Sequence, residues 1–301
     1  VVALGKLGGR EMTAASDLDL IVLYDFDEKK GESSGKRPLS GAQYYARFTQ
    51  RLLAALSAPT AEGTLYEVDF RLRPSGKSGP LATNIDAFVA YQAKDAWTWE
   101  HMALTRARVI AGDKSLIARA EKEIAKVLAT RRDPKKTRKA VLEMRAIVEE
   151  EKGGGGPWDL KQTPGGLVDI EFIAQYLELI HGSDKPAVLS TETDAVLTKA
   201  AEAGLLKPKE ADVLLPALRL YQALTQILRL CLDEVFDPDT APRGMKSLLA
   251  RAAALPDFAT LDRAVRETEQ AVRQSFERVI GKVSATGADR AQLRYRDRGE
   301  D

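Results

Sequence analysis

Three aspartates, Asp17, Asp19 and Asp69, have the residue type and spacing to do chemistry. Asp17 and Asp19 flank Leu18 at the start of the apolar run Leu18–Tyr24. In an extended chain, residues two apart point to the same face, so the two carboxylates lie side by side. Neighbouring carboxylates repel each other unless a cation lies between them, and ligand sets made only of oxygen favour Mg²⁺ or Mn²⁺. The pair therefore indicates either a metal site or a solvated strand end.

The third carboxylate, Asp69, lies in a segment that alternates apolar and charged residues, which predicts a strand over Thr64–Leu72. Its polar face carries Glu67, Asp69, Arg71 and Arg73. Such a face is either an exposed sheet surface or a carboxylate flanked by phosphate-binding arginines. If Asp69 faces the other two aspartates, three carboxylates can hold two divalent ions, as in-line phosphoryl or nucleotidyl transfer requires. Asp69 would then also help to deprotonate an attacking hydroxyl.

A glycine pair, Gly8-Gly9, precedes the acids. It follows an apolar segment, Val1–Leu4, expected to be a strand, and precedes a helix predicted over residues 10–15. Residues without a Cβ let backbone N–H groups come close to a phosphate, although a glycine pair alone is ordinarily a turn. Ser16 either caps a turn or holds a phosphate oxygen. Arg106 either reaches a triphosphate or is a surface arginine that follows a helix.

The elements that must position these residues mix strand and helix patterns as far as Gly112-Asp113. Leu18–Tyr24 is predicted to be a buried strand, residues 25–40 an exposed loop, residues 73–80 a turn-rich loop, and Ala42–Leu56 and Ile85–Trp99 helices. Beyond this point strand patterns largely vanish. Helical patterns follow at about 114–128, 134–152, 166–181, 191–204, 208–235, 243–254 and 258–282, with Gly153–Gly156 as a surface loop. The sequence predicts an α+β protein: an α/β domain over 1–113, an all-helical bundle domain over 114–283 and a frayed tail over 284–301.

Composition excludes several classes of function. Lys and Arg total 45 and Asp and Glu total 44, and this near-balance argues against a strongly basic nucleic-acid binder. A single cysteine excludes an internal disulfide framework and suits the cytoplasm. Two histidines make a multi-His zinc site untenable. No apolar run reaches the roughly 18–20 residues of a membrane span, and the start of the chain lacks a signal-peptide pattern and suggests a piece of a longer protein.

The run from Gly8-Gly9 to Asp17-Leu18-Asp19 resembles the signature of the nucleotidyltransferase superfamily of the DNA polymerase β type. Longer stretches resemble the bacterial glutamine synthetase adenylyltransferase family, strongly over residues 1–182 and beyond them only in helical character: Gly5–Tyr24, Tyr66–Leu81, Ala96–Asp113 and Gly165–Leu179. This family has two homologous halves, one that adds AMP to glutamine synthetase and one that removes it. Residues 96–101 and the Asp-Leu-Lys run that ends at Lys161 look like the C-terminal, adenylylating half.

The resemblance implies a polymerase β-like α/β domain that moves AMP from Mg-ATP onto a tyrosine hydroxyl of glutamine synthetase and releases pyrophosphate, in the regulation of nitrogen metabolism. It carries the metal-binding acids over onto Asp17, Asp19 and Asp69, and the phosphate-side glycines onto Gly8 and Gly9. It implies Mg²⁺ (or Mn²⁺) as cofactor and ATP as substrate. Glutamine and a PII-type signalling protein would regulate the full-length enzyme. Neither nucleic acid nor membrane is an expected partner.

Three alternatives remain open. The first is the de-adenylylating half of the same enzyme, in which phosphate is the nucleophile. The second is a uridylyltransferase that acts on a PII-type protein and prefers UTP. The third belongs to another class: a non-catalytic module that senses nucleotide, against which the presence of all three carboxylates and the glycine pair argues.

Overall fold

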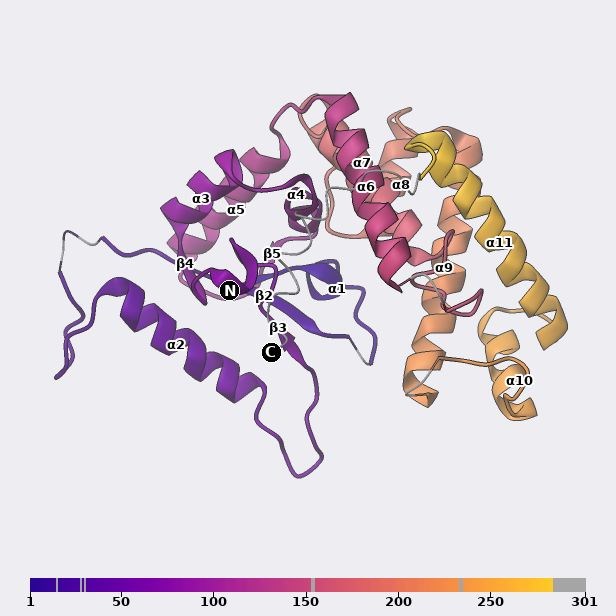
Figure 1. The fold of residues 1–301 in the computed structure, drawn as a ribbon, viewed down its shortest axis with the longest axis horizontal. Helices are drawn as coiled ribbons and strands as arrows, with labels where there is room; N and C mark the ends of the chain where they lie inside the picture. Colours follow the sequence, from indigo (N-terminus) through magenta and orange to yellow (C-terminus); the bar gives the residue numbers. More distant parts are fainter. Residues whose placement is uncertain (15, 28, 30, 153–154, 233–234, 284–301) are drawn as a thin grey trace. The chain divides into compact units, whose positions relative to one another are not determined.

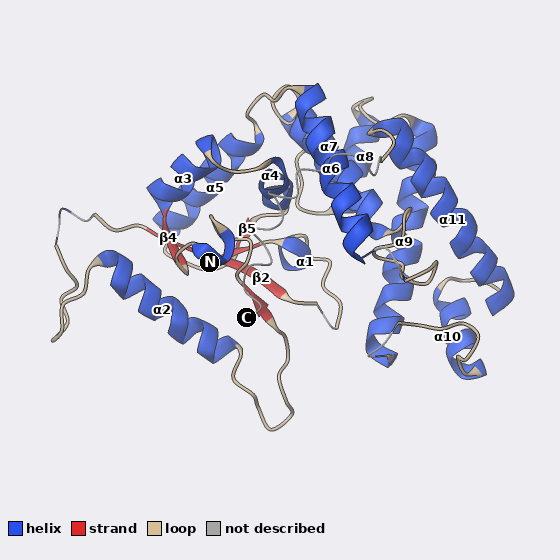
Figure 2. Ribbon diagram, in the orientation of Figure 1, coloured by secondary structure: helices blue, strands red, loops and turns tan. Residues whose placement is uncertain are grey.

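The computed structural model describes residues 1–14, 16–27, 29, 31–152, 155–232 and 235–283. Contacts divide this part of the chain into two compact units. The first contains Val1–Met12 and Ser16–Thr130, and the second contains mainly the residues from Arg131 onward. Helices predominate, and strands occur only in the first unit among the described residues (Figures 1 and 2). The tail predicted over 284–301 lies outside the described residues.

A five-stranded mixed sheet forms the centre of the first unit. Its main path runs β3-β2-β1-β5, and β4 pairs with β2 in addition. The strands are β1 (Val2–Ala3), β2 (Leu18–Tyr24), β3 (Val68–Asp69), β4 (Ala82–Asn84) and β5 (Arg108–Val109). β2 is antiparallel to β1 and parallel to β3 and β4, so the strand predicted from the apolar run is confirmed as the centre of the sheet.

Side chains cap the starts of helices α2 and α3 in the first unit. Ser40 Oγ accepts a hydrogen bond from Gln43 N (3.3 Å) at the start of α2 (Gly41–Leu56), and Asn84 caps α3 (Ile85–Lys94). α2 packs on the sheet, where the ring of Tyr45 stacks on Tyr24 with centroids 4.4 Å apart. The other helices of this unit are α1 (Gly5–Gly8), η2 (Gly76–Ser78), α4 (Thr98–Thr105) and α5 (Lys114–Leu128).

The second unit is helical and is built around α7 (Leu167–His181), which packs against α6, α8, α9 and α11. Nearly all of its apolar side chains are buried, as expected for a helix that has neighbours on every side. The surrounding elements are α6 (Pro134–Lys152), η3 (Pro186–Val188), α8 (Thr193–Glu202), α9 (Pro208–Cys231), α10 (Arg243–Ala252) and α11 (Phe258–Val279). The structure thus confirms the helices predicted after residue 130. Among the described residues, no helix combines the length and the apolar character that crossing a membrane requires.

Three elements of the first unit differ from prediction. The helix expected over residues 10–15 is wrong. The helix lies earlier, at Gly5–Gly8 (α1), and it ends at its C-cap Gly9, after which Arg10 has φ 56°. The strand expected over Thr64–Leu72 contracts to Val68–Asp69, because Arg71 N donates to Asp69 Oδ1 and turns the chain. The helix expected over Ile85–Trp99 is two helices, since the Glu100 carboxylate accepts from Trp97 N and starts α4 afresh.

The boundary between the compact units lies after Thr130, whereas the sequence suggested a domain boundary after residue 113. The break at Gly112-Asp113 is a helix start, because the Asp113 carboxylate caps α5 by accepting from Ser115 N. α5 then packs on α3, α4 and β5 of the first unit. The change from mixed to helical patterns therefore marks the end of the sheet and not the end of the unit that contains it.

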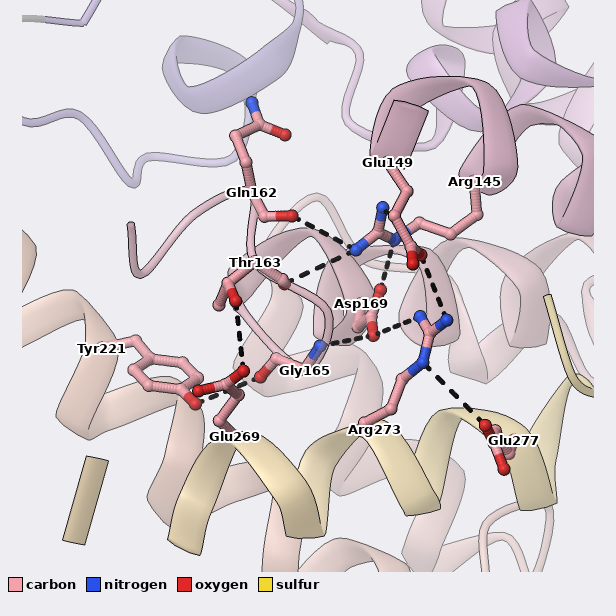
Figure 3. Close-up of polar contacts among 10 residues, drawn as sticks. All are labelled: Arg145, Glu149, Gln162, Thr163, Gly165, Asp169, Tyr221, Glu269, Arg273 and Glu277. Carbon is pink, nitrogen blue, oxygen red and sulfur yellow. Dashed lines mark hydrogen bonds and ion pairs between the residues drawn. The ribbon is translucent and has the colours of Figure 1, made fainter. Parts of the chain in front are cut away.

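A buried ion-pair network fixes the start of α7 (Figure 3). Asp169, fully buried, pairs through Oδ1 with the fully buried Arg145 of α6. Its other oxygen accepts from Gly165 N (2.8 Å) and from Arg273 Nη1 of α11 (3.2 Å). Arg273 also donates to Glu149 (3.1 Å), so helices α6, α7 and α11 share one set of charges. The carboxylate of Asp169 is thus a packing element of the second unit.

Replacement of Asp169 by Asn should lower the free energy of unfolding by about 3–5 kcal/mol, because the buried Arg145 loses its shortest ion pair and keeps only the longer one with Glu149 (3.6 Å). The matched control is Asp194→Asn, which breaks an exposed ion pair with Arg219 (3.4 Å) and should cost within about 1 kcal/mol. Urea unfolding followed by circular dichroism measures both. Equal urea midpoints for the two variants would contradict a stabilising role for the network.

Candidate functional site

Asp17 and Asp19 lie where the chain enters β2. Asp17 is exposed directly before the strand and Asp19 is half-buried within it. Main-chain hydrogen bonds hold this entrance on both sides: Leu18 N donates to Glu67 O (2.8 Å), and Leu4 N donates to Asp19 O (2.9 Å). The neighbouring strands therefore fix the backbone from which both carboxylates project.

Asp69 lies beside them on β3. In the parallel pairing of β2 and β3, Asp19 and Asp69 are register partners, so their Cα atoms are direct neighbours across the sheet. The Asp69 carboxylate is held by Arg71, which donates its backbone N to Oδ1 (2.6 Å) and its Nε to Oδ2 (2.7 Å). The alternation in the sequence thus correctly predicted that Asp69 lies on a strand, although the strand is only two residues long.

The cation that holds Asp69 is Arg71. The pKa of Arg71 is raised, first by its hydrogen bond to Asp69 and further by the negative charges of Asp69, Asp17 and Asp19. Of these four residues, the structure places Asp19 and Asp69 in register on paired strands and pairs Arg71 with Asp69.

A divalent ion would fit the chemistry of this donor set, which is made of carboxylate oxygens only. As the side chains stand, no group of three or more His, Cys, Asp or Glu among the described residues is close enough together to hold a metal ion. Arg71 holds Asp69 instead, but its side chain is 49% exposed and can rotate into solvent. The metal-binding role of the three acids stays a prediction.

The glycine pair is hydrogen-bonded and closely packed within the chain. Gly8 N donates to Leu4 O (2.7 Å) and Gly9 N donates to Gly5 O (3.1 Å), so both amides are used within the chain. A Cβ on Gly8 would lie 1.9 Å from Arg106 O, which requires glycine there for close backbone packing. This hydrogen bonding does not support the prediction that the two amides hold phosphate.

Arg106 is buried, which excludes the surface arginine considered for it, and it contacts the α1 segment. Its role towards a triphosphate stays a prediction. Its Nε donates to Gly5 O (3.0 Å), and its Nη2 forms an ion pair with Glu11. Arg108 donates in the same way to Gly8 O (3.1 Å) and to Leu7 O (2.8 Å). The two arginines fasten α1 to the segment that leads into β5.

Two further predicted residues lie inside the unit. Ser16 is buried directly before Asp17. Arg73, predicted to share the charged face of the strand, is buried instead and donates to Phe70 O (2.8 Å) and to the carbonyls of Lys77 and Gly79. Burial lowers the pKa of Arg73. The phosphate role of Ser16 stays a prediction, whereas Arg73 closes the turn that follows β3.

Sequence reasoning missed Gly5 and Glu11. Gly5 has φ +50°, and a Cβ built on it would lie 2.0 Å from Asp19 Oδ2. The sequence offered a signal for Gly5, because a glycine directly after a short strand suggests a special backbone conformation. It offered none for Glu11, whose partner Arg106 is 95 positions away.

Two family models match the chain, one over each unit. The model for glutamate-ammonia ligase adenylyltransferase matches residues 1–123, and the model for GlnD PII-uridylyltransferase matches residues 142–280. The interval between the two matches contains residue 130, where the structure divides. The sequence comparison and the contacts thus separate the same two parts.

Curated relatives match nearly the whole chain. A bifunctional glutamine synthetase adenylyltransferase/adenylyl-removing enzyme of Rhodopseudomonas palustris is 53% identical over 285 residues, which are 95% of this chain and 29% of that protein. The enzymes of the same name from Xanthobacter autotrophicus and Bradyrhizobium diazoefficiens are 54% and 49% identical, over 93% and 96% of this chain and 28% and 29% of their own length. The chain thus spans less than a third of these relatives. The chain matches one segment of these proteins, and the resemblance seen in the motifs is confirmed. The chain belongs to the family of bifunctional glutamine synthetase adenylyltransferase/adenylyl-removing enzymes.

Proposed function

We propose that the first unit of this chain is a nucleotidyltransferase centre that moves AMP from Mg-ATP onto a tyrosine hydroxyl of glutamine synthetase and releases pyrophosphate. The observation that carries the proposal is the register of Asp19 with Asp69 on two paired strands, with Asp17 directly before the first strand and Arg71 paired with Asp69. The names of the relatives support glutamine synthetase as the protein that is modified. Transfer from ATP would place the reaction in the cytoplasm.

In this proposal Asp17, Asp19 and Asp69 hold Mg²⁺ or Mn²⁺. The bound ions would supply positive charge for the triphosphate and for the attacking oxygen, as in other in-line transfers. Asp69, in register with Asp19, would also accept the proton of the tyrosine hydroxyl. The strand pairing supports these roles because it keeps the carboxylates in place while substrates exchange.

Arg71 would change partners during the cycle. It neutralises Asp69 in the metal-free protein, and its exposed side chain can turn towards the phosphates of ATP when a metal takes its place. A guanidinium suits both partners, because its fork of donors matches carboxylate and phosphate equally well. Of the two arginines predicted to bind nucleotide, we therefore assign this role to Arg71, while Arg106 supports the loop that precedes Asp17.

The regulatory partners follow from the relatives less directly. The match of residues 142–280 to a PII-uridylyltransferase model favours a link between the helical unit and PII-type signalling. The same match makes uridylylation of a PII-type protein the second candidate function. We further propose that glutamine and a PII-type protein act on the full-length enzyme, and that this segment is the adenylylating part and not the phosphorolytic one.

Purified chain incubated with glutamine synthetase, Mg²⁺ and α-labelled ATP should transfer label to the synthetase. Asp17→Asn should reduce the rate by more than about a hundredfold, since losing even an outer partner of a metal ligand costs roughly 10- to 100-fold. The matched control is Asp25→Asn, at the other end of β2, whose carboxylate pairs with Arg119 (2.8 Å) and should leave the rate unchanged.

Three outcomes would contradict the proposal. Label that persists in Asp17→Asn would remove this residue from the site. Transfer from UTP to a PII-type protein in preference to ATP would establish the second candidate. Release of ADP from AMP-modified synthetase with phosphate, without forward transfer, would assign the chain to the removing activity.

Arg71→Met should strengthen Mn²⁺ binding in the absence of nucleotide and raise the KM for ATP. The half-exposed ion pair with Asp69 is worth roughly 0–1 kcal/mol, so the gain in Mn²⁺ affinity should be at most about fivefold. Arg47→Met, on the exposed face of α2, is the control and should change neither quantity. Titration of free Mn²⁺ by electron paramagnetic resonance measures the affinity, and weaker binding by Arg71→Met would show that Arg71 does not compete with the ion.

A further inference from the structure

We propose that Gly5 is a positioning residue whose side-chain-free backbone confines the carboxylate of Asp19, and that the buried pair of Arg106 and Glu11 holds Gly5 in place. This inference rests on the proposed function, in which Asp19 is a metal ligand. It adds to that function the residues that determine the position of the Asp19 carboxylate.

The contact between Gly5 and Asp19 leaves no room for a side chain. A Cβ on residue 5 would lie 2.0 Å from Asp19 Oδ2 and 2.9 Å from its Cγ. Real Cβ atoms do not come so close to other atoms, so any other residue forces the carboxylate or the backbone to move. The φ of +50° at Gly5 is also one that residues with a side chain rarely adopt.

The backbone of Gly5 is held from two directions. Its carbonyl oxygen accepts from Arg106 Nε (3.0 Å) and from Gly9 N (3.1 Å). The preceding residue, Leu4, donates its N–H to Asp19 O (2.9 Å), which ties the start of α1 to the strand that carries the acid. Movement of residue 5 away from Asp19 would therefore strain its hydrogen bonds to Arg106 and Gly9 and the bond that joins Leu4 to β2.

Arg106 is itself anchored. Its side chain is 7% exposed, and it forms an ion pair with Glu11, whose side chain is 13% exposed. Removing one member of a buried pair leaves the other charge without compensation, which is costly. A chain of contacts thus runs from Glu11 through Arg106 and Gly5 to the Asp19 carboxylate.

The opposite side of Asp19 is limited by its register partner, Asp69. Like charges on neighbouring strands favour wide separation of the two carboxylates. The Gly5 backbone restricts this movement for Asp19 without contributing a side chain. The confined carboxylate then stays beside Asp69, where one ion can be shared.

The first test is Mn²⁺ affinity, titrated by electron paramagnetic resonance without nucleotide. Gly5→Ala should bind Mn²⁺ at least about tenfold more weakly, the lower end of the loss seen when a ligand loses its support. The matched control is Gly41→Ala in the same unit, whose new Cβ would meet the ring of Phe26 at 2.3 Å and should leave Mn²⁺ affinity unchanged. A folded Gly5→Ala protein with wild-type affinity would overturn the positioning role.

The second test is a stability cycle, which needs neither metal nor activity. The cost of Gly5→Ala in the free energy of unfolding should be smaller in an Asp19→Ala background, because the clashing carboxylate is gone. If Gly5→Ala alone does not fold, folding of the double variant supports the proposal. Equal costs in both backgrounds, or failure of both proteins to fold, would overturn it.

These tests separate the inference from the proposed function. Absence of Mn²⁺ binding by the wild-type chain, or binding that Asp19→Asn leaves unaltered, would contradict the metal site. The stability cycle would still decide whether residue 5 confines Asp19. Support in the cycle with no effect on Mn²⁺ would show that Gly5 packs on Asp19 without serving a metal ligand, which overturns the positioning role.

Discussion

Electrostatic repulsion between two carboxylates on neighbouring strands is the constraint on which this part of the first unit depends. Asp19 and Asp69 cannot move far apart, because β2 and β3 are paired at that point in the sheet. Their negative charge must therefore be balanced where it stands. Arg71 supplies that balance in this structure, and its raised pKa reflects the charges of Asp69, Asp17 and Asp19. In the proposed function, this exchangeable cation would let the site bind a metal ion without first accumulating uncompensated charge.

Much of this arrangement could be predicted from the sequence, because long patterns have a clear period. The apolar run of β2 and the helices α5 to α11 gave signals that extend over several turns or over a whole strand. Two-residue strands such as β3 and β5 carry too few residues to show a period, and β4 with three carries little more. The helix expected over residues 10–15 failed for another reason: a glycine pair is compatible with a helix end as well as with a helix start, and here Gly9 is the C-cap of α1.

The acids were easier to predict than the arginines. Asp17 and Asp19 are two apart in the sequence at the entrance to β2, so local geometry alone predicts that they share a side. Arg73 and Arg106, by contrast, bind main-chain carbonyl groups inside the unit, and nothing in their immediate neighbours indicates this. An arginine can satisfy several carbonyl groups at once because its donors form a planar fork. Sequence patterns show that such a side chain is charged, but tertiary contacts decide whether it serves a ligand or the fold.

The charge network around Asp169 has a consequence for the order in which the helical unit is made. Asp169 and Glu149 together carry two negative charges. Of the arginines that pair with them, only Arg145 has been synthesised when α7 leaves the ribosome. Arg273 contacts both acids but lies 104 positions after Asp169, in the last helix described. The charges of these two acids therefore cannot be fully balanced during most of the synthesis of the unit. The balance is completed only when α11 has been synthesised and Arg273 can pair with them.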